Sequence, residues 1–258
     1  MGRIHLFEFE DLRWFPDFLR NYGTDFLQFL SNRMKVYRPV VPLLEMALSK
    51  SNTAKIIDLG SGGGGGLLWV SNELKKSHPN LKILLTDLYP NIAAFGYTKK
   101  QSDHFEYIDT SVDARNVPAN LSGLRTQFLS LHHFKPKDAV KILQNAVDAG
   151  QGIAIVEAQE RSVKSFLAMF FSPISVLLST PFIRPFKIGR IIFTYVIPLV
   201  PCFVWWDGMV SCLRTYNIDE MKELMCKVHN NASYHWDIGK LKSGPGVLLY
   251  LIGLKKDQ

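Results

Sequence analysis

A run of glycines follows a short apolar segment and precedes a helical pattern of apolar residues. Gly60 and the glycines from Gly62 to Gly66 come directly after the segment Lys55–Leu59. Glycine adopts backbone conformations that side chains exclude, and a loop between a strand and a helix turns backbone N–H groups and a helix N-terminus toward a ligand. Such a loop is typical of a nucleotide-cofactor site at the carboxyl edge of a parallel sheet.

The glycine pattern by itself fits more than one class of cofactor site. A P-loop requires Lys followed by Ser or Thr after its last glycine, whereas Leu67 and Leu68 stand here, so ATP hydrolysis is excluded. A dinucleotide-binding loop reads GxGxxG, which Gly60, Gly62 and Gly65 match, and is followed by an acid after the second strand. A nicotinamide-dependent oxidoreductase therefore stays open as an alternative.

The residues around the glycines favour a different cofactor. The segment from Ile56 to Gly64 reads IIDLGSGGG. It resembles the first motif of the class I S-adenosylmethionine-dependent methyltransferases, hydrophobic-hydrophobic-Asp-hydrophobic-Gly-x-Gly-x-Gly, in which the acid corresponding to Asp58 is expected. The resemblance covers about residues 55 to 160, and more weakly the part after Trp206. It implies an enzyme with S-adenosyl-L-methionine as cofactor and no need for a metal ion.

Further cofactor-binding residues follow from the same resemblance. Asp87, after the second strand, matches the acid that accepts hydrogen bonds from the cofactor ribose, with Leu88 beside the adenine, although a turn Asp would look the same. Asp113 and Ala114 match an Asp-Ala pair at the adenine amino group. The implied cofactor-binding set is Asp58, Gly60, Ser61, Gly62, Gly64, Asp87, Leu88, Asp113, Ala114 and Ser130.

Three residues are candidates for catalysis. The segment QFLSLHHF resembles the family's hydrophobic strand that ends in a His-His pair, here His132 and His133. Either imidazole could act as a general base, because histidine titrates near neutrality. Glu157 follows the fifth expected strand and could position or deprotonate a nucleophile. The alternatives are a histidine satisfied at the sheet edge and a glutamate that caps a helix.

An apolar segment interrupts the pattern between residues 165 and 206. We weigh three alternatives: a helical cap packed on the sheet, a cap that also lines an apolar substrate pocket, and membrane insertion. The expected acceptor is a small, apolar or lipid-like molecule, methylated at O, N or C by in-line displacement. A fold relative that binds the cofactor without methyl transfer is a further alternative. Candidate substrate-binding residues are Trp14, Tyr22, Gln159, Trp206, Arg214 and Tyr216.

The periodicity of apolar residues places these groups on a sheet. Helical spacing fills residues 11 to 50, and strands are expected at 55–59, 81–85, 105–108, 127–131 and 152–156, with helices at 67–76, 136–149 and 218–229. A final hairpin is expected at 233–238 and 247–253. The alternation predicts an α/β, doubly wound, Rossmann-like sheet of seven strands, mostly parallel with an antiparallel terminal hairpin. We expect an N-terminal helical cap at 1–50 and a methyltransferase domain at 51–258, with the apolar helical insertion at 162–210.

Composition limits the partners. The net charge of +7 suits an anionic partner, but the lysine pairs are scattered without interleaved aromatic residues, so we expect no nucleic acid. Cys202, Cys212 and Cys226 lack CxxC spacing and are expected to be reduced thiols. Glu8 and Glu10 interrupt the N-terminal apolar run, which argues against a secretory signal. We therefore expect a cytoplasmic protein, with peripheral association at the inner membrane face as an alternative and the oligomeric state left open.

Overall fold

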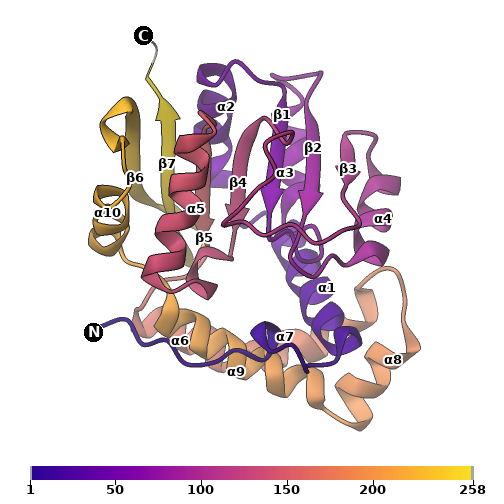
Figure 1. Cartoon of the computed structure of the whole chain (residues 1–258). Coiled ribbons are helices and arrows are strands. Elements are labelled where there is room, and N and C mark those ends of the chain that lie inside the picture. Colours follow the sequence, from indigo (N-terminus) through magenta and orange to yellow (C-terminus); the bar gives the residue numbers. More distant parts are fainter. Residues whose placement is uncertain (1, 257–258) are drawn as a thin grey trace.

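A seven-stranded sheet forms the centre of the computed structural model, which describes residues 2–256 (Figure 1). Its strand order is β3-β2-β1-β4-β5-β7-β6. The first five strands are parallel, and β7 runs antiparallel between β5 and β6. The predicted fold is therefore confirmed. The strands are β1 (Lys55–Leu59), β2 (Lys82–Thr86), β3 (Phe105–Tyr107), β4 (Leu124–Phe128), β5 (Ile153–Glu157), β6 (Tyr234–Ser243) and β7 (Gly246–Lys255).

Helices cover both faces of the sheet, as a doubly wound fold requires. One apolar core packs α2 (Val41–Lys50) and α3 (Leu67–Leu74) against the sheet. A second core on the other face contains buried residues of α5 (Pro136–Asp148) and α10 (Ile218–Cys226). The remaining elements of these parts are α1 (Asp17–Arg33), α4 (Ile92–Gln101) and the 3-10 turns η1 (Phe9–Asp11), η2 (Arg38–Val40), η3 (Leu131–His133) and η6 (Asn231–Ser233).

The apolar insertion folds into helices beyond the carboxyl ends of the parallel strands, where the arrowheads of β1 and β2 point in Figure 1. Its elements are α6 (Val163–Phe170), α7 (Ser172–Ser179), η4 (Thr180–Phe182), α8 (Ile188–Ile191), the π-helix η5 (Ile192–Val196) and α9 (Leu199–Arg214). A third core joins it to the N-terminal part, with Phe15 and Phe26 packed among Val176, Val200 and Phe203. The N-terminal helix and the insertion thus share one apolar core.

Within residues 2–256, no single helix has both the length and the apolar composition of a membrane-spanning segment. Two bent pairs of helices meet both criteria when each pair is taken together. The first joins Val163–Phe170 to Ser172–Phe182 at 43°, and the second joins Ile188–Val196 to Leu199–Arg214 at 77°.

Two local predictions were wrong or incomplete. The fourth strand begins and ends three residues earlier than expected, because Arg125 and Gln127 are buried within β4 despite their polarity. Leu129 has a φ of 49°, and the chain then turns into η3, so the apolar residues Leu129 and Leu131 lie beyond the strand. Helix α4 was not predicted, and it begins where the Asn91 side chain accepts a hydrogen bond from the Ala94 N–H at 3.1 Å.

Candidate cofactor and active site

The glycine loop is tied to the end of the neighbouring strand by its own backbone. The Ser61 N–H donates to the Thr86 carbonyl at 2.9 Å, and the Gly62 N–H donates to the Asp87 carboxylate at 2.7 Å. The φ angles of Gly60 and Gly62 are 67° and 55°, which a side chain would strain. Three of the loop amides, those of Ser61, Gly62 and Gly64, are therefore satisfied inside the protein, because the Gly64 N–H donates to the Ser61 carbonyl.

Asp58 lies under this loop at the end of β1. Its carboxylate accepts hydrogen bonds of 2.6 Å from the hydroxyls of Ser61 and Thr126, and its side chain is almost fully buried. Burial raises the pKa of Asp58 to about 7, and the two hydroxyl donors limit that rise. The acid that the sequence motif singled out is thus a buried hydrogen-bond acceptor that braces the loop against β4.

Asp87 follows β2 and faces the loop. Besides Gly62, the N–H of Tyr89 donates to its carboxylate at 2.8 Å. Burial raises the pKa of Asp87, while these two backbone donors act in the opposite direction. Leu88 beside it is 41% exposed, which leaves an apolar side chain open at the rim. This acid and apolar pair form one wall of the site.

A cavity of about 550 Å³ opens between the loop, the ends of the parallel strands and the N-terminal helix. Its volume falls in the range of small-molecule sites. The lining includes residues from α1 that the sequence did not indicate, among them Arg20, Asn21 and Thr24. The predicted site residues that line it are Asp58, Gly60, Ser61, Gly62, Asp87, Leu88, Asp113, Ala114, Ser130, His133 and Arg214.

Two buried polar side chains of the cavity wall lack partners. Both amide atoms of Gln127 and the hydroxyl of Ser130 have no hydrogen-bond partner among residues 2–256. Because a buried polar group without a partner costs about 1–3 kcal/mol, these atoms fit a ligand with polar groups in the cavity. Gln127 was not among the predicted site residues, because the strand was expected to begin there, whereas β4 ends one residue after it.

The N-terminal helix closes one side of the loop. A Cβ placed on Gly63 would come within 2.8 Å of the Thr24 carbonyl oxygen, so only glycine permits this approach of loop and helix. The Asn32 side chain strengthens the contact by donating to the Gly65 carbonyl at 2.8 Å. Residues outside the recognisable motifs therefore fix the shape of the cofactor loop.

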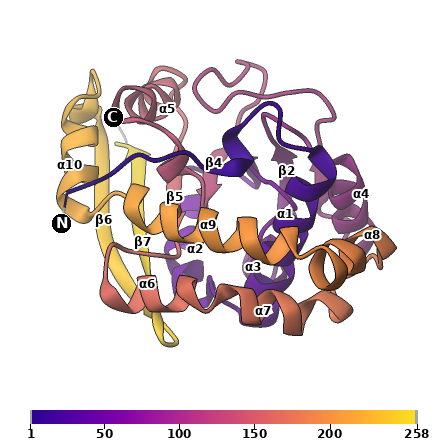
Figure 2. The ribbon, with the colours of Figure 1, turned by 90° about the horizontal axis from the view of Figure 1, so that it is seen from below.

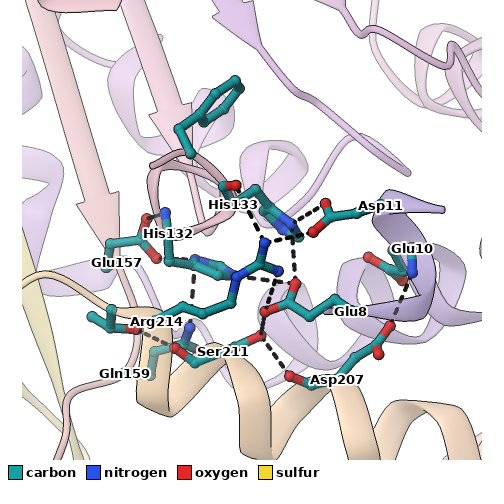
Figure 3. A network of polar contacts seen from close by, with 12 residues as sticks. Glu8, Glu10, Asp11, His132, His133, Glu157, Gln159, Asp207, Ser211 and Arg214 are labelled. Carbon is teal, nitrogen blue, oxygen red and sulfur yellow. Dashed lines mark hydrogen bonds and ion pairs between the residues drawn. The ribbon is translucent and has the colours of Figure 1, made fainter. Parts of the chain in front are cut away.

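Figure 3 shows a network of charged groups that includes Asp11, His133 and Arg214 of the cavity lining. His133 Nδ1 contacts Glu8 at 3.0 Å and Asp11 at 2.8 Å, and the Arg214 guanidinium contacts the same two carboxylates at 3.0 and 2.7 Å. Burial by itself would lower the pKa of His133, but Glu8 and Asp11 raise it well above the ordinary value. His133 is therefore held as an imidazolium, and the pKa of Glu8 is lowered by its cationic neighbours against the effect of burial.

His132 connects this network to Glu157, because its Nε2 lies 3.9 Å from the Glu8 carboxylate. Its Nδ1 lies 2.7 Å from the Glu157 carboxylate, and its backbone N–H donates to the same carboxylate at 3.1 Å. Both side chains are buried and neither lines the cavity. Gln159 lies at the edge of hydrogen-bonding distance, 3.5 Å from His132 Nδ1. Glu157 therefore fixes the conformation of the turn that carries both histidines.

Three of these groups are arranged as metal ligands would be. Ligand atoms of Glu8, His132 and His133 lie within 4.8 Å of one another. In the structure, however, Arg214 and Asp11 already contact Glu8 and His133. A metal ion would compete with these ion pairs for the same atoms.

Two carboxyl groups beside the network, those of Asp207 and Glu10, were not among the predicted site residues. Asp207 accepts hydrogen bonds from the N–H groups of Phe9 and Glu10 at 2.7 and 3.2 Å. Burial, followed by the charge of Asp207, raises the pKa of Glu10 to about 8, and burial raises that of Asp207 to about 7. Glu10 itself lines the cavity. Glu8 and Glu10, which the sequence analysis treated only as interruptions of an apolar run, thus belong to the site.

The remaining predicted residues lie outside the cavity lining or have protein partners. The Asp113 carboxylate pairs with Arg115 at 2.7 Å, and the Tyr216 hydroxyl donates to the Phe134 carbonyl at 2.7 Å. The indole N–H of Trp206 donates to the Phe7 carbonyl at 3.0 Å. The predicted site residues that do not line the cavity are Gly64, Trp14, Tyr22, His132, Glu157, Gln159, Trp206 and Tyr216.

Comparison with known proteins finds likeness only in structure. No family model matches the sequence, and no curated protein sequence matches it. Among similar solved structures is an O-methyltransferase family protein from Burkholderia thailandensis, with 17% identity and a TM-score of 0.49, covering 87% of this chain and 57% of that one. Human N-acetylserotonin methyltransferase in complex with SAM has 16% identity and a TM-score of 0.48, covering 90% and 56%.

A third similar structure is the plantazolicin methyltransferase BpumL in complex with SAH. It has 12% identity and a TM-score of 0.49, and the match covers 93% of this chain and 97% of that one. Of the Burkholderia protein and the human enzyme, in contrast, the chain spans less than two thirds of the length. At these identities, the function has to be argued from the residues of the chain itself.

Proposed function

We propose that the chain binds S-adenosyl-L-methionine in the cavity and transfers its methyl group to a small-molecule acceptor. The observation that carries this proposal is the glycine loop closed on an acid, with the Gly62 N–H bonded to Asp87 at 2.7 Å and Asp58 buried beneath. The Asp87 carboxylate at the cavity wall suits a ligand with hydroxyl groups and positive charge, and Asp58 holds the loop in place beneath it. A sulfonium cofactor with a ribose has both.

The same features argue against a dinucleotide. A pyrophosphate is bound by free loop N–H groups, whereas those of Ser61, Gly62 and Gly64 are bonded inside the protein. Moreover, the sheet carries an antiparallel strand, β7, between β5 and β6, whereas the dinucleotide-binding order is 3-2-1-4-5-6 in a mostly parallel sheet.

The lining residues divide into two groups around such a ligand. Asp87 would accept hydrogen bonds from the ribose hydroxyls, and Leu88 and Ala114 would flank the adenine. Gln127 and Ser130, whose polar atoms lack partners among residues 2–256, would satisfy polar groups nearer the methionine part. This assignment gives a partner to the amide of Gln127 and to the hydroxyl of Ser130.

When bound, S-adenosylmethionine supplies a methyl group on an electrophilic sulfonium. The protein then has to hold an acceptor in line with it, since proximity and orientation supply much of the rate. In this proposal His133 donates a hydrogen bond to the acceptor, because its raised pKa keeps the proton on the ring at neutral pH. Glu8 and Asp11 hold the imidazolium, and Glu157 acts as a positioning residue through the backbone of His132.

The acceptor that fits this arrangement is a nucleophile that has already lost its proton or carries a free lone pair. A hydroxyl acceptor would need His133 to lose its own proton first, so its methylation would speed up as pH rises. A free amine or a phenolate would need no such step. The proposal therefore favours acceptors with an accessible lone pair over simple alcohols.

Native mass spectrometry of the freshly purified protein tests the cofactor assignment. We expect a bound ligand with the mass of S-adenosylmethionine or S-adenosylhomocysteine, and loss of that ligand in Ser130→Ala, with Ser243→Ala as the matched control outside the cavity. A bound nicotinamide dinucleotide would favour the oxidoreductase alternative. Cofactor binding without S-adenosylhomocysteine formation on any amine, phenol or lipid acceptor would indicate a binding protein.

A further inference from the structure

The insertion exposes an unusual concentration of large apolar side chains. Fifteen of the twenty-five exposed large hydrophobic residues within the described chain lie between Val163 and Leu199. We name their surface the apolar face. It consists of Val163, Leu167, Phe170, Phe171, Ile174, Leu177, Leu178, Phe182, Phe186, Ile188, Ile192, Tyr195, Val196, Ile197 and Leu199.

Helix α7 shows that this exposure is not incidental. Leu178 is 69% exposed and Ile174 is 53% exposed, whereas Ser172 and Thr180 are buried. A helix at a water-facing surface buries apolar residues and exposes polar ones, whereas α7 buries Val176 and exposes the apolar Ile174, Leu177 and Leu178. Helix α7 therefore presents its apolar side to its surroundings.

The elements that carry the apolar face lie next to one another. Helices α6 and α7 follow end to end alongside α9 in Figure 2, and the rings of Phe170 and Phe171 meet at 5.3 Å. Helix η5 joins α7 through a hydrogen bond from the Tyr195 hydroxyl to the Leu177 carbonyl. Patches of this extent mark interaction sites in monomeric proteins.

Only one side of these helices is available to a partner. Their inner side packs against the rest of the protein, with Val176 and Ile183 buried in the core shared with α1 and α9. Arg190 is also buried on the inner side, where it pairs with Asp25 at 2.7 Å. A partner would therefore contact the apolar face from outside, with these helices lying flat against it.

The charges along this segment have one sign. Residues 162 to 206 contain four basic residues and no Asp or Glu. Lys164 and Arg184 are exposed, and no acid pairs with either within residues 2–256. Aromatic and aliphatic side chains flanked by lysine and arginine are typical of helices that lie in the headgroup region of an anionic bilayer.

We propose that the apolar face docks on a lipid bilayer that contains anionic headgroups. The aromatic and aliphatic side chains would enter the boundary between headgroups and acyl chains, while Lys164 and Arg184 contact the headgroups. A second copy of the chain fits this face less well. A two-fold contact would add Lys164 and Arg184 of a second copy to those of the first, with no acid of the segment to neutralise them, while Lys187 and Arg190 are already paired with Asp25.

Flotation of the full-length protein with lipid vesicles tests this proposal, which does not depend on the proposed methyl transfer. We expect co-flotation with vesicles of phosphatidylcholine and phosphatidylglycerol, and weaker binding to phosphatidylcholine alone or at high salt. The double variant Leu178→Ser and Phe182→Ser should lower the partition coefficient about tenfold or more. Both side chains are more than 60% exposed, so the change leaves no cavity in the core.

Matched controls separate the face from general stickiness. Met34→Ser removes an equally exposed apolar side chain at the end of α1 and should bind vesicles like the unchanged protein. Lys164→Glu should weaken binding to anionic vesicles, whereas Lys50→Glu, at the end of α2, should not. Circular dichroism spectra and melting temperatures confirm that each variant folds.

Three outcomes would overturn the proposal. The first is a failure of the unchanged protein to float with either kind of vesicle. The second is equal flotation of the double variant and the unchanged protein. The third is a dimer, seen by light scattering, that the same double variant converts to monomers, because the apolar face would then be an interface between copies.

Discussion

The backbone N–H of Gly62 donates a hydrogen bond of 2.7 Å to the carboxylate of Asp87, across 25 residues of sequence. This bond joins the glycine loop to the acid that follows β2, and both line the cavity. The loop thus helps to fix the position of the proposed ribose-binding acid. The consequences can be tested one residue at a time.

Replacement of Asp87 tests its role in cofactor binding. Asp87→Ala removes a charged acceptor, and hydrogen bonds to charged groups contribute about 1.5–3 kcal/mol, so affinity for S-adenosylmethionine should fall by roughly ten- to hundredfold. Asp87→Asn keeps one acceptor oxygen, so its affinity for S-adenosylmethionine should lie between those of Asp87→Ala and the unchanged protein. Asp109→Asn, at an exposed position, serves as the control. Equal affinity of Asp87→Ala and the unchanged protein would remove Asp87 from the site.

The close approach of the loop to α1 gives a prediction about stability. Gly63→Ala would place a Cβ 2.8 Å from the Thr24 carbonyl oxygen, which should lower the free energy of unfolding by about 1–3 kcal/mol and weaken cofactor binding. Gly96→Ala is the control, because no atom lies within 4 Å of its added Cβ and helix propensity favours alanine. Chemical denaturation measures the free energy of unfolding of both variants. A Gly63→Ala protein as stable as Gly96→Ala would show that loop and helix do not touch.

The raised pKa of Asp58 predicts how the stability of the folded protein changes with pH. Its pKa is about 7 in the folded protein, against an unfolded value near 3.8, so the unfolded chain releases this proton first. The contribution of Asp58 to stability therefore falls as pH rises from about 4 to about 7, by something of the order of 4 kcal/mol at most.

Melting temperatures of Asp58→Asn across this pH range test that sign. Near pH 4 the variant should resemble the unchanged protein, since both carry a neutral side chain, and near pH 8 it should be the more stable of the two. Asp109→Asn controls for the loss of a surface charge. A difference in melting temperature that stays constant with pH would contradict the raised pKa.

The network around His133 predicts an unusual histidine titration. Nitrogen NMR of the imidazole should give a pKa well above 6.5, because Glu8 and Asp11 outweigh the effect of burial. The stability that His133 gains from Glu8 and Asp11 is fully present below the pKa of histidine in the unfolded chain. It is lost as the pH rises through the pKa of His133 in the folded protein. Glu8→Gln should lower the pKa of His133, whereas Glu106→Gln on β3 should leave it unchanged. An ordinary pKa in the unchanged protein would mean that the network does not form.

The sequence predicted those parts of the site that are local in the chain. Lys55–Leu59, the glycines and Asp87 lie within one βαβ unit, so periodicity and motif place them together. Strand β4 was misplaced because it contains buried polar residues, two of which are bonded to distant partners. Arg125 donates to Asn145, 20 residues away, and Thr126 donates to Asp58, 68 residues away.

The network around Glu8 and His133 could not be predicted from the sequence. Glu8 and Arg214 are separated by about two hundred residues, and their contact depends on how the N-terminal segment crosses α9. Nothing in the local pattern around Glu8 indicates a buried acid. The exposed residues of α7 were equally hidden, because an apolar run has the same composition whether it faces a core or the outside.

Isothermal titration calorimetry of the purified protein with S-adenosylmethionine and, separately, with NADH tests the central claim most directly. The structure predicts saturable one-to-one binding of S-adenosylmethionine, weakened in Asp87→Ala, and no binding of NADH. Saturable binding of NADH with no response to S-adenosylmethionine would contradict the account.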